Sequence, residues 1–473
     1  MTDDQMTQTP PLAVDKVRAL VREKTPAEQL VGPIREAIEA DFLVDVADQL
    51  AALHPADFAD LIEYLDKDDR RALVDQLDRL FVPDVLAELN DDVREDIVDW
   101  LPDQAVQSAL GALEADDAAH IADDLSDEDK DRYLSGVDAH DRAAIEETLA
   151  YPEYSAGRLM SRDFVVVPQN WTVGQALDFL RAEENDALPT DFYQVYLIDP
   201  AYRPLAGVGL SRIMREPRQI QLKDIAGHSL HSFPPTYDQE ELAFKFRQYG
   251  LVEVPIVAEE SGRMLGIVTV DDVIEVIEEE AEDNLLKLVG LQGGELDVQE
   301  SWWRTSRSRF VWLLVNLLTV VIAVSVIAQF SDLIETYGAL AVLLPIVASM
   351  GGNSGTQTLA VAIRGLATKE LSLQNARGFI RKELLVGLFN GVAFALITGL
   401  CVFLAYQEPG LSLVIALAMI LNLLVAPLSG TLIPIALEHR GIDPANASAV
   451  FLTTITDVVG FFAFLGLAGV IFL

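Results

Sequence analysis

VFLTTITDVVGFFAFLGLAGVIFL, residues 450–473, is apolar and long enough to cross about 30 Å of hydrocarbon. Asp457 lies about a third of the way along this stretch, and no Lys or Arg within it compensates the charge. A lone carboxylate at such a depth costs roughly 2–3 kcal/mol on insertion scales. Since intramembrane carboxylates are expensive, Asp457 is predicted to be a functional residue.

Four more apolar spans precede this one, which predicts a membrane domain of five helices. They lie near 308–330, 339–364, 384–406 and 411–437, and the fifth lies near 449–473. Basic residues mark one side of these spans. Arg304, Arg307 and Arg309 precede the first span, Lys369, Arg377, Arg381 and Lys382 lie between the second and third, and Arg440 lies between the fourth and fifth. The positive-inside rule then predicts a cytoplasmic N-terminal part and a C-terminus outside a plasma or inner cell membrane.

This orientation allows depths to be compared between the second and fifth spans. Asp457 lies about eight residues, or about 12 Å, from the inner end of its span. Eight residues back from Arg364 is Thr356, so Asn353, Ser354, Thr356 and Gln357 are expected at about the depth of Asp457. Gly351, Gly352 and Gly355 allow close backbone approach or local unwinding. Polar groups at a shared depth indicate a water-filled ion path, and a two-fold dimer would supply two copies of Asp457.

Helix packing and proton transfer are the alternatives to an ion path for these residues. Small-residue helix packing accounts for GGNSG alone, and for Gly387, Gly391, Asn390 and Asn422. An isolated membrane Asp can also carry protons. Mg²⁺ fits a single carboxylate per chain, because this ion keeps most of its waters.

The charge of the chain is concentrated in its first 300 residues. The net charge is -40, whereas residues 301–473 hold nine basic and eight acidic side chains, so the preceding part is near -41. An acidic surface of this size argues against nucleic acid and for cations or basic partners. The N-terminus has no signal-peptide pattern, and the single cysteine, Cys401, excludes an intrachain disulfide.

A leucine repeat predicts a helical solenoid in the N-terminal part. Apolar residues recur every twelve positions, at Leu53, Leu65, Leu77, Leu89, Leu101, Leu113, Leu125, Val137 and Leu149. In one continuous helix each would turn about 120° from the last, so the chain must break between them. The breaks carry helix-capping or helix-ending residues, such as His54-Pro55, Asn90-Asp91 and Ser126-Asp127. The alternative is an ordinary helical bundle with accidental spacing.

Strands alternate with helices from about 151 to 275. FVVVP, QVYLID and EVPIVAEESGRMLGIVTVDD are β-branched runs, and two related halves follow one another. These halves resemble a tandem pair of cystathionine-β-synthase (CBS) domains, in which a Gly-x-x-Ser/Thr-x-x-Asp stretch often lines a nucleotide site. Gly266, Thr269 and Asp272 match it, so ATP is a candidate ligand of the second copy. Leu210 and Ile213 occupy the matching polar positions in the first copy and disfavour binding there.

An acidic helix is predicted to join the CBS pair to the membrane. In DDVIEVIEEEAEDNLLKLVG, Glu275, Glu279, Glu282 and Asp283 share one helical face. A solvated acidic face is the simplest interpretation. It is weakened because this helix leads directly into the membrane part, where another element must pack against it.

Four separated motifs resemble the MgtE-type magnesium channel family. They are LHPADFADLIEYL with YPEYSAGRLM, GIVTVDDVIEVIEEEAED, SMGGNSGTQTLAVAIRGLAT and LTTITDVVGF. The resemblance runs from about residue 30 to the end and implies a homodimer, joined through its membrane and CBS domains, with an ion path lined by the second and fifth spans. It implies five parts: an N-terminal extension (1–29), a helical superhelix domain (30–150), tandem CBS domains (151–275), a plug helix (276–303) and a five-helix transmembrane domain (304–473).

The resemblance also implies where ions bind. Asp457 matches the pore aspartate, with Asn353, Thr356 and Gln357 as further pore positions. The positions that would sense intracellular Mg²⁺ and close the pore are Asp84, Asp116, Asp238, Glu240, Asp272, Glu275, Glu280, Asp283 and Asp443. His120, Gly250 and Asn284 stand where the family can offer acidic residues, and Ala449 stands where an Asn can occur, so the number of sensing ions is open.

The sequence thus predicts a multidomain membrane protein: an α-solenoid, an α/β CBS pair, a connecting plug helix and a five-helix transmembrane domain. The leading function is Mg²⁺ uptake gated by intracellular Mg²⁺. A proton-coupled secondary transporter and a membrane-tethered metal or nucleotide sensor without transport are the alternatives. No Ser/His/Asp set, P-loop or zinc-type Cys/His spacing indicates an enzyme.

Overall fold

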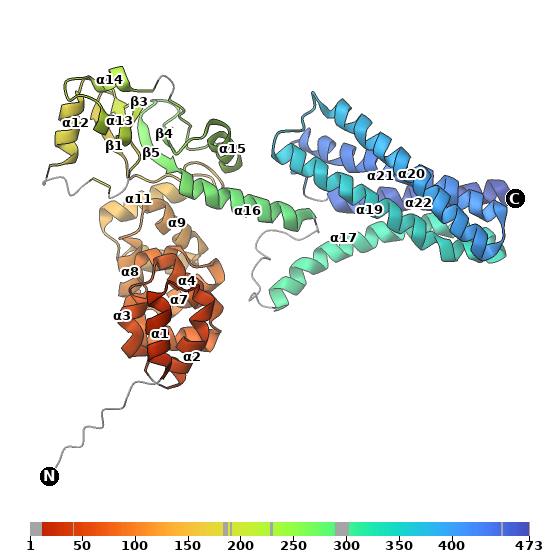
Figure 1. Ribbon diagram of the computed structural model, residues 1–473, viewed down its shortest axis with the longest axis horizontal. Coiled ribbons are helices and arrows are strands. Elements are labelled where there is room, and N and C mark those ends of the chain that lie inside the picture. Colours follow the sequence, from red (N-terminus) through yellow and green to blue (C-terminus); the bar gives the residue numbers. More distant parts are fainter. Residues whose placement is uncertain are drawn as a thin grey trace, which may run out of the picture. The chain divides into compact units, whose positions relative to one another are not determined.

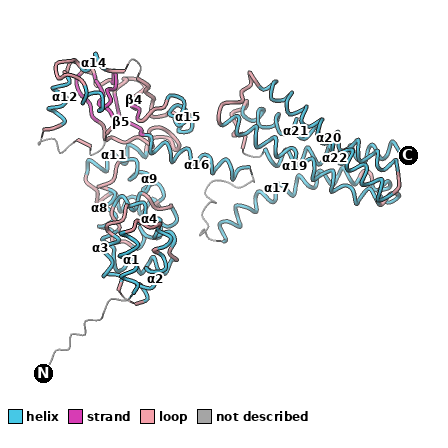
Figure 2. Tube along the Cα trace, viewed as in Figure 1, coloured by secondary structure: helices cyan, strands magenta, loops and turns pink. Residues whose placement is uncertain are grey.

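The computed structural model describes residues 12–40, 42–182, 188–189, 192–227, 230–288, 302–445 and 448–472 (Figure 1). The chain divides into two compact units, residues 1–277 and 278–473. The first contains helices and two small sheets, whereas the described part of the second contains helices joined by loops (Figure 2).

Short helices build the N-terminal part of the first unit. They are α1 (Leu12–Arg22), α2 (Val31–Glu39), α3 (Ala47–Leu50), α4 (Pro55–Tyr64), α5 (Lys67–Leu77), α6 (Pro83–Ala87), α7 (Asp91–Trp100), α8 (Asp103–Leu110), α9 (Ala115–Asp124), α10 (Asp127–Leu134) and α11 (Ala139–Leu149), with 3-10 turns at Ala27–Gln29, Leu43–Val46 and Asp78–Leu80. The predicted solenoid is confirmed.

The repeated leucines end the helices as predicted. Leu65, Leu101 and Leu125 have extended backbones directly after α4, α7 and α9. The next helix then starts on a new axis, and at α10 the Ser126 hydroxyl accepts a hydrogen bond from the N–H of Asp129. Because Leu65 and Leu101 are also buried, each break places an apolar side chain in the core.

The helices pack in two alternating rows. α4 contacts α6, α6 contacts α8, and α8 contacts α10, while α5 contacts α7 and α9 contacts α11. In the second row, α5, α7, α9 and α11 begin at residues 67, 91, 115 and 139, so their starts are 24 residues apart. The structural repeat is therefore two helices, twice the spacing of the leucines.

Two α/β modules follow in the same order of elements. The first has β1 (Val165–Pro168), α12 (Val173–Leu180), β2 (Gln194–Ile198), β3 (Pro204–Gly209), α13 (Leu210–Arg215) and α14 (Leu222–Ile225). β2 pairs parallel with β1 and antiparallel with β3. The second has α15 (Gln239–Tyr249), antiparallel β4 (Glu253–Val257) and β5 (Met264–Thr269), and a parallel bridge between Phe233 and Ile256. The long helix α16 (Val270–Leu288) follows β5, as predicted.

Five helices in the described part of the second unit are long and apolar enough to cross a membrane. They are α17 (Trp302–Ala328), α19 (Ala339–Ala367), α20 (Ala376–Tyr406), α21 (Pro409–Glu438) and α22 (Ser448–Phe472). A short helix that was not predicted, α18 (Ser331–Thr336), connects the first two. α20 also begins eight residues before the predicted third span, which places Arg377, Arg381 and Lys382 within its first two turns.

The glycines of the second span act by close packing and not by unwinding. α19 is one continuous helix, so the predicted alternative of an unwound, broken segment is wrong. A Cβ atom on Gly351 would lie 2.2 Å from the Asn422 amide nitrogen, and one on Gly355 would lie 2.8 Å from Leu452. These glycines let α21 and α22 approach the α19 backbone, and helical hydrogen bonding continues through them.

Asn422 on α21 lies at the crossing of three helices. Its side chain is fully buried and donates a hydrogen bond of 2.7 Å from Nδ2 to the carbonyl of Val347 on α19. A Cβ atom on Gly460 of α22 would also lie 2.9 Å from Nδ2. Gly387 and Gly391 of α20 pack closely against Leu423 and Ile420 of α21. Asn422, Gly460, Gly387 and Gly391 therefore serve the packing of the helices.

Candidate ion path and cation-sensing sites

One direct contact between α19 and α22, and one through Asn422 of α21, indicate the level of Asp457. Gly355 meets Leu452, and Gly351 and Gly460 both meet Asn422. Asp457 lies between Leu452 and Gly460 on α22, and its level on antiparallel α19 is therefore near residues 352–354. With about 1.5 Å of rise per residue, Asn353 is the predicted pore residue nearest to this level. Thr356 and Gln357 lie about 5 Å further toward Arg364.

The side chains of the predicted pore residues are accessible. Asp457 is half-buried, and Asn353, Thr356 and Gln357 are exposed on their helix. Asp457 makes no hydrogen bond or ion pair with any described residue. A carboxylate without such a partner inside an apolar helix favours an ion or water ligand.

A second carboxylate of the membrane unit was not predicted. Glu383 is 8% exposed and accepts a 3.0 Å hydrogen bond from the hydroxyl of Thr358, linking α20 to α19. Lys382 also approaches it, at 3.5 Å. The predicted span began at residue 384, which left Glu383 in a loop. The basic residues beside Glu383 lower the local hydropathy, so the sequence did not indicate that the helix already begins at Ala376.

An acidic cluster lies between the start of α9 and the start of α16 in the first unit; its members are Asp116, Asp117, Asp272 and Glu275. Asp116 and Asp272 repel one another, as do Asp117 and Glu275. The Oδ1 atom of Asp116 is buried and makes no hydrogen bond with the described chain. The structure thus brings together three of the predicted sensing residues, Asp116, Asp272 and Glu275.

The cluster resists full ionisation. Burial, followed by repulsion from Asp272, raises the pKa of Asp116 well above its usual value. Burial of the carboxyl groups also raises the pKa of Asp117 and of Asp272 to about 6, although hydrogen bonds from Thr269 act in the opposite direction on Asp272. A bound divalent cation would relieve this repulsion.

The segment that enters the two α/β modules contacts α9 on the solenoid side of this cluster. The Ser161 hydroxyl donates a hydrogen bond to Glu114, the residue that precedes α9. Arg158 forms an ion pair of 3.1 Å with Asp123 near the end of α9. These contacts connect α9 to the chain that enters the α/β modules, within the same unit as the start of α16.

A second group of predicted sensing residues already contains a cation. In the second unit, the Lys287 Nζ atom lies 2.5 Å from Asp283 and 2.6 Å from Asp443. Asp283 and Lys287 are on the last turns of α16, and Asp443 is in the loop between α21 and α22. Burial lowers the pKa of Lys287, but the hydrogen bonds to both carboxylates outweigh it, and the net shift is upward. The lysine thus stays charged and lies between two carboxylates that were each predicted to sense Mg²⁺.

The remaining predicted sensing residues are not brought into either group. Asp84 is exposed on α6. Asp238 caps α15 by accepting a hydrogen bond from the N–H of Glu241, and Glu240 is exposed on the first turn of that helix. Glu280 lies in the middle of α16, where its carbonyl accepts a hydrogen bond from Asn284.

The predicted nucleotide residues have local structural roles. The Thr269 hydroxyl donates a 2.7 Å hydrogen bond to Asp272, which fastens the start of α16. A Cβ atom on Gly266 would lie 2.3 Å from Met160 and 2.4 Å from the Ser161 carbonyl, so packing requires glycine there. A nucleotide would have to share Thr269 and Asp272 with this helix cap.

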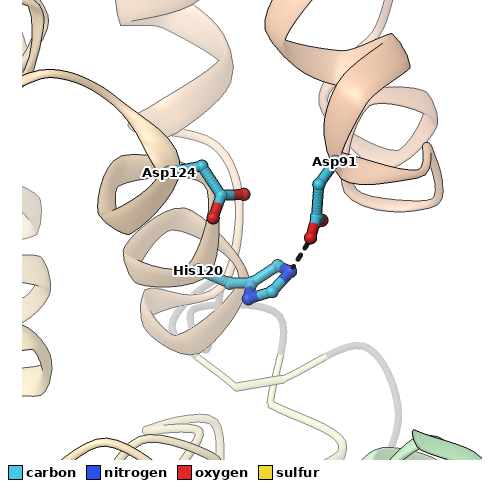
Figure 3. A group of neighbouring side chains, drawn as sticks. All are labelled: Asp91, His120 and Asp124. Atoms are coloured by element: carbon cyan, nitrogen blue, oxygen red, sulfur yellow. Dashed lines mark ion pairs between the residues drawn. The ribbon is translucent and has the colours of Figure 1, made fainter. Parts of the chain in front are cut away.

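A group of metal-ligand type was not predicted from the sequence. Ligand atoms of Asp91, His120 and Asp124 lie within 4.8 Å of one another (Figure 3). The nearly buried Arg94 pairs with Asp91 and, at 3.8 Å, with Asp124. The hydrogen bond with His120 lowers the pKa of Asp91 to about 2, and the same bond raises the pKa of His120. Because Arg94 already balances these carboxylates, the group fits an ion-pair network that ties α7 to α9.

Known families match three separate parts of this chain. Residues 344–467 match the family model of MgtE, described as a divalent cation transporter. Residues 53–154 match the MgtE intracellular N domain, and residues 222–279 match the CBS domain. The magnesium transporter MgtE of Bacillus subtilis is 32% identical over 320 residues, which cover 67% of this chain and 70% of that protein. This chain belongs to the MgtE family.

One further curated relative and two solved structures are similar to parts of this chain. The magnesium transporter MgtE of Thermus thermophilus is 34% identical over 331 residues, covering 68% of this chain and 71% of that protein. A crystal structure of the soluble part of a magnesium transporter is 25% identical, with a TM-score of 0.47, and covers 54% of this chain and 99% of that one. The cytosolic domain of the Mg²⁺ channel MgtE in complex with ATP is 28% identical, with a TM-score of 0.47, and covers 51% of this chain and 98% of that one.

Membership of the MgtE family and five long apolar helices make the chain a multi-pass membrane protein. The predicted family and fold class are both confirmed.

Proposed function

We propose that this protein is a Mg²⁺ channel that mediates magnesium uptake and closes when intracellular Mg²⁺ is high. Two chains form the ion path, each contributing α19 and α22. The observation that carries the proposal is Asp457: an accessible membrane carboxylate, level with Asn353, without a partner in the described chain, in a protein of the MgtE family.

The chemistry of Asp457 suits a hydrated ion. Mg²⁺ sheds water reluctantly and is usually held by one or two carboxylates that leave several waters in place. A two-fold axis would put two Asp457 carboxylates around one ion, and the Asn353 amides at the same level could hydrogen-bond its waters. The exposure of Asn353 on a single chain supports a place facing the second copy.

Closure at high Mg²⁺ is proposed to work through both acidic groups. Without cations, the acidic cluster pushes α9 and the start of α16 apart. A divalent cation bound there would draw them together and fix the direction of α16. At the other end of α16, Asp283 and Asp443 offer carboxylates to a second ion once Lys287 is displaced. Cytoplasmic placement of the first unit follows from the predicted orientation.

A flux assay with purified protein in liposomes tests the pore. Asp457→Ala should abolish Mg²⁺ uptake while the protein still elutes as a folded dimer. Asp332→Ala serves as the matched control, because Asp332 is an exposed carboxylate on the short connecting helix α18. Full flux through Asp457→Ala would remove the basis of the assignment.

The same liposomes separate the other functions. A proton-coupled transporter requires a pH gradient to drive uptake, whereas the channel follows the Mg²⁺ gradient alone. A sensor without transport passes no divalent cation at any internal Mg²⁺ concentration. ATP binding at Gly266, Thr269 and Asp272 stays a prediction, to be tested by calorimetry with Thr269→Val as the comparison. The boundaries of the five predicted domains likewise stay predictions.

A further inference from the structure

A groove opens between α20 and α21 at the end of the membrane unit that carries the basic residues. Its volume is about 430 Å³. Five leucine and isoleucine side chains and two arginines line it: Ile380, Leu384, Leu385, Leu388, Leu424, Arg377 and Arg381. The lining is therefore apolar along most of its length and cationic at one end.

The two arginines at this end have no counter-ion among the described residues. Arg377 and Arg381 are exposed, and neither forms an ion pair or hydrogen bond with a residue that the structure describes. They are four residues apart on one face of α20, where like charges repel. They also lie in the first turns of that helix, where the helix dipole disfavours cations. All three effects would be relieved by an anion at this position.

The order of the side chains matches an amphiphile. From Arg377 to Leu388 the helix rises about 16 Å, from the charged end into the apolar part of the span. A phosphate at the arginines would leave an attached hydrocarbon chain in contact with the leucines. A free phosphate would use only the charged end and leave the apolar lining exposed.

We propose that this groove binds one anionic phospholipid, with its phosphate on Arg377 and Arg381 and an acyl chain along Leu384, Leu388 and Leu424. Basic pockets between membrane helices are suited to anionic headgroups, because each arginine contributes attraction in addition to burial of the chain. This site is separate from the proposed ion path and does not depend on Mg²⁺ transport.

Native mass spectrometry of the delipidated full-length protein tests this site, with phosphatidylglycerol and phosphatidylcholine added in turn. The wild type should retain phosphatidylglycerol preferentially. Arg377→Gln with Arg381→Gln should weaken its binding about 30-fold, at roughly 1 kcal/mol for each arginine. Lys382→Gln is the matched control, since Lys382 contacts Phe379 and Glu383 and does not line the groove.

A second variant keeps both arginines. Leu424→Trp should fill the apolar part of the groove and also reduce phosphatidylglycerol retention. Equal retention by the double arginine variant and the wild type would overturn the proposal, as would displacement of the lipid by millimolar inorganic phosphate. Loss of the dimer with unchanged lipid retention would instead assign this face to a second copy of the chain.

Discussion

Replacing Lys287 with methionine should make the protein close at lower Mg²⁺. Lys287 now binds both Asp283 and Asp443, which are predicted ligands of a regulatory ion. A Mg²⁺ ion and the ammonium group cannot occupy the same carboxylate oxygens. The lysine is therefore a competitor attached to the chain, and its removal leaves two uncompensated carboxylates for the metal.

The size of the effect follows from the two ion pairs. The Lys287 side chain is 23% exposed, and those of Asp283 and Asp443 are 28% and 39% exposed. Partly exposed pairs of this kind contribute about 0.5–1 kcal/mol each. Displacing both thus costs Mg²⁺ about 1–2 kcal/mol, so Lys287→Met should lower the half-closing Mg²⁺ concentration roughly 5- to 30-fold.

The assay is Mg²⁺ flux into liposomes with internal Mg²⁺ varied stepwise, for protein oriented with its first unit inside. Lys287→Arg is the control, because it keeps the charge and should close near the wild-type concentration. A midpoint for Lys287→Met equal to that of the wild type, or above it, would refute competition at this pair. If Mg²⁺ flux continued at every internal Mg²⁺ concentration in the wild type and in both variants, gating by intracellular Mg²⁺ would be refuted.

Three further predictions concern stability, each followed by thermal unfolding. Asn422→Leu should cost about 1 kcal/mol, because it removes the hydrogen bond to Val347 in the membrane unit; an unchanged midpoint in detergent would contradict this role. Gly355→Val should lower the free energy of unfolding by about 1–3 kcal/mol, because the added side chain would push α19 away from Leu452. Gly352→Val should lower it much less, because no atom lies within 4 Å of a Cβ at that position. Mg²⁺ should stabilise the first unit more at pH 7.5 than at pH 5. Two carboxyls of the acidic cluster, Asp117 and Asp272, have a pKa of about 6 in the folded protein and near 4 in the unfolded chain, so they become charged and repel one another only as the pH increases past about 6. Equal Mg²⁺ effects at both pH values would argue against the cluster as a metal site.

Local patterns of the sequence predicted most of the fold. The leucine spacing located the breaks between α4 and α11, and hydropathy located five spans, because both depend on residues close together in the chain. The start of α20 was placed late, since Glu383 and its basic neighbours reduce the hydropathy of a helix that continues through them. Long basic side chains can reach the interface while their helix extends further.

The register between helices could not be predicted from the sequence. Counting from Arg364 placed Thr356 at the level of Asp457, whereas the contacts at Gly351 and Gly355 place residues 352–354 there. Counting residues from the charged end of each span assumes that both ends lie at the same depth in the membrane. Flexible arginine side chains can reach the interface from different depths, so this assumption fails. Lys287 was missed for a related reason, because Asp443 lies 156 residues from it in the chain.

The two-row packing of the solenoid limits how its length can change. One row contains α5, α7, α9 and α11, whose starts are 24 residues apart. Deleting or duplicating 24 residues would return every later helix to its original row, with the same face inward. A change of twelve residues would preserve each leucine at its break but exchange the rows, and α9 would then no longer face α16. Relatives of this protein are therefore expected to gain or lose solenoid helices in pairs.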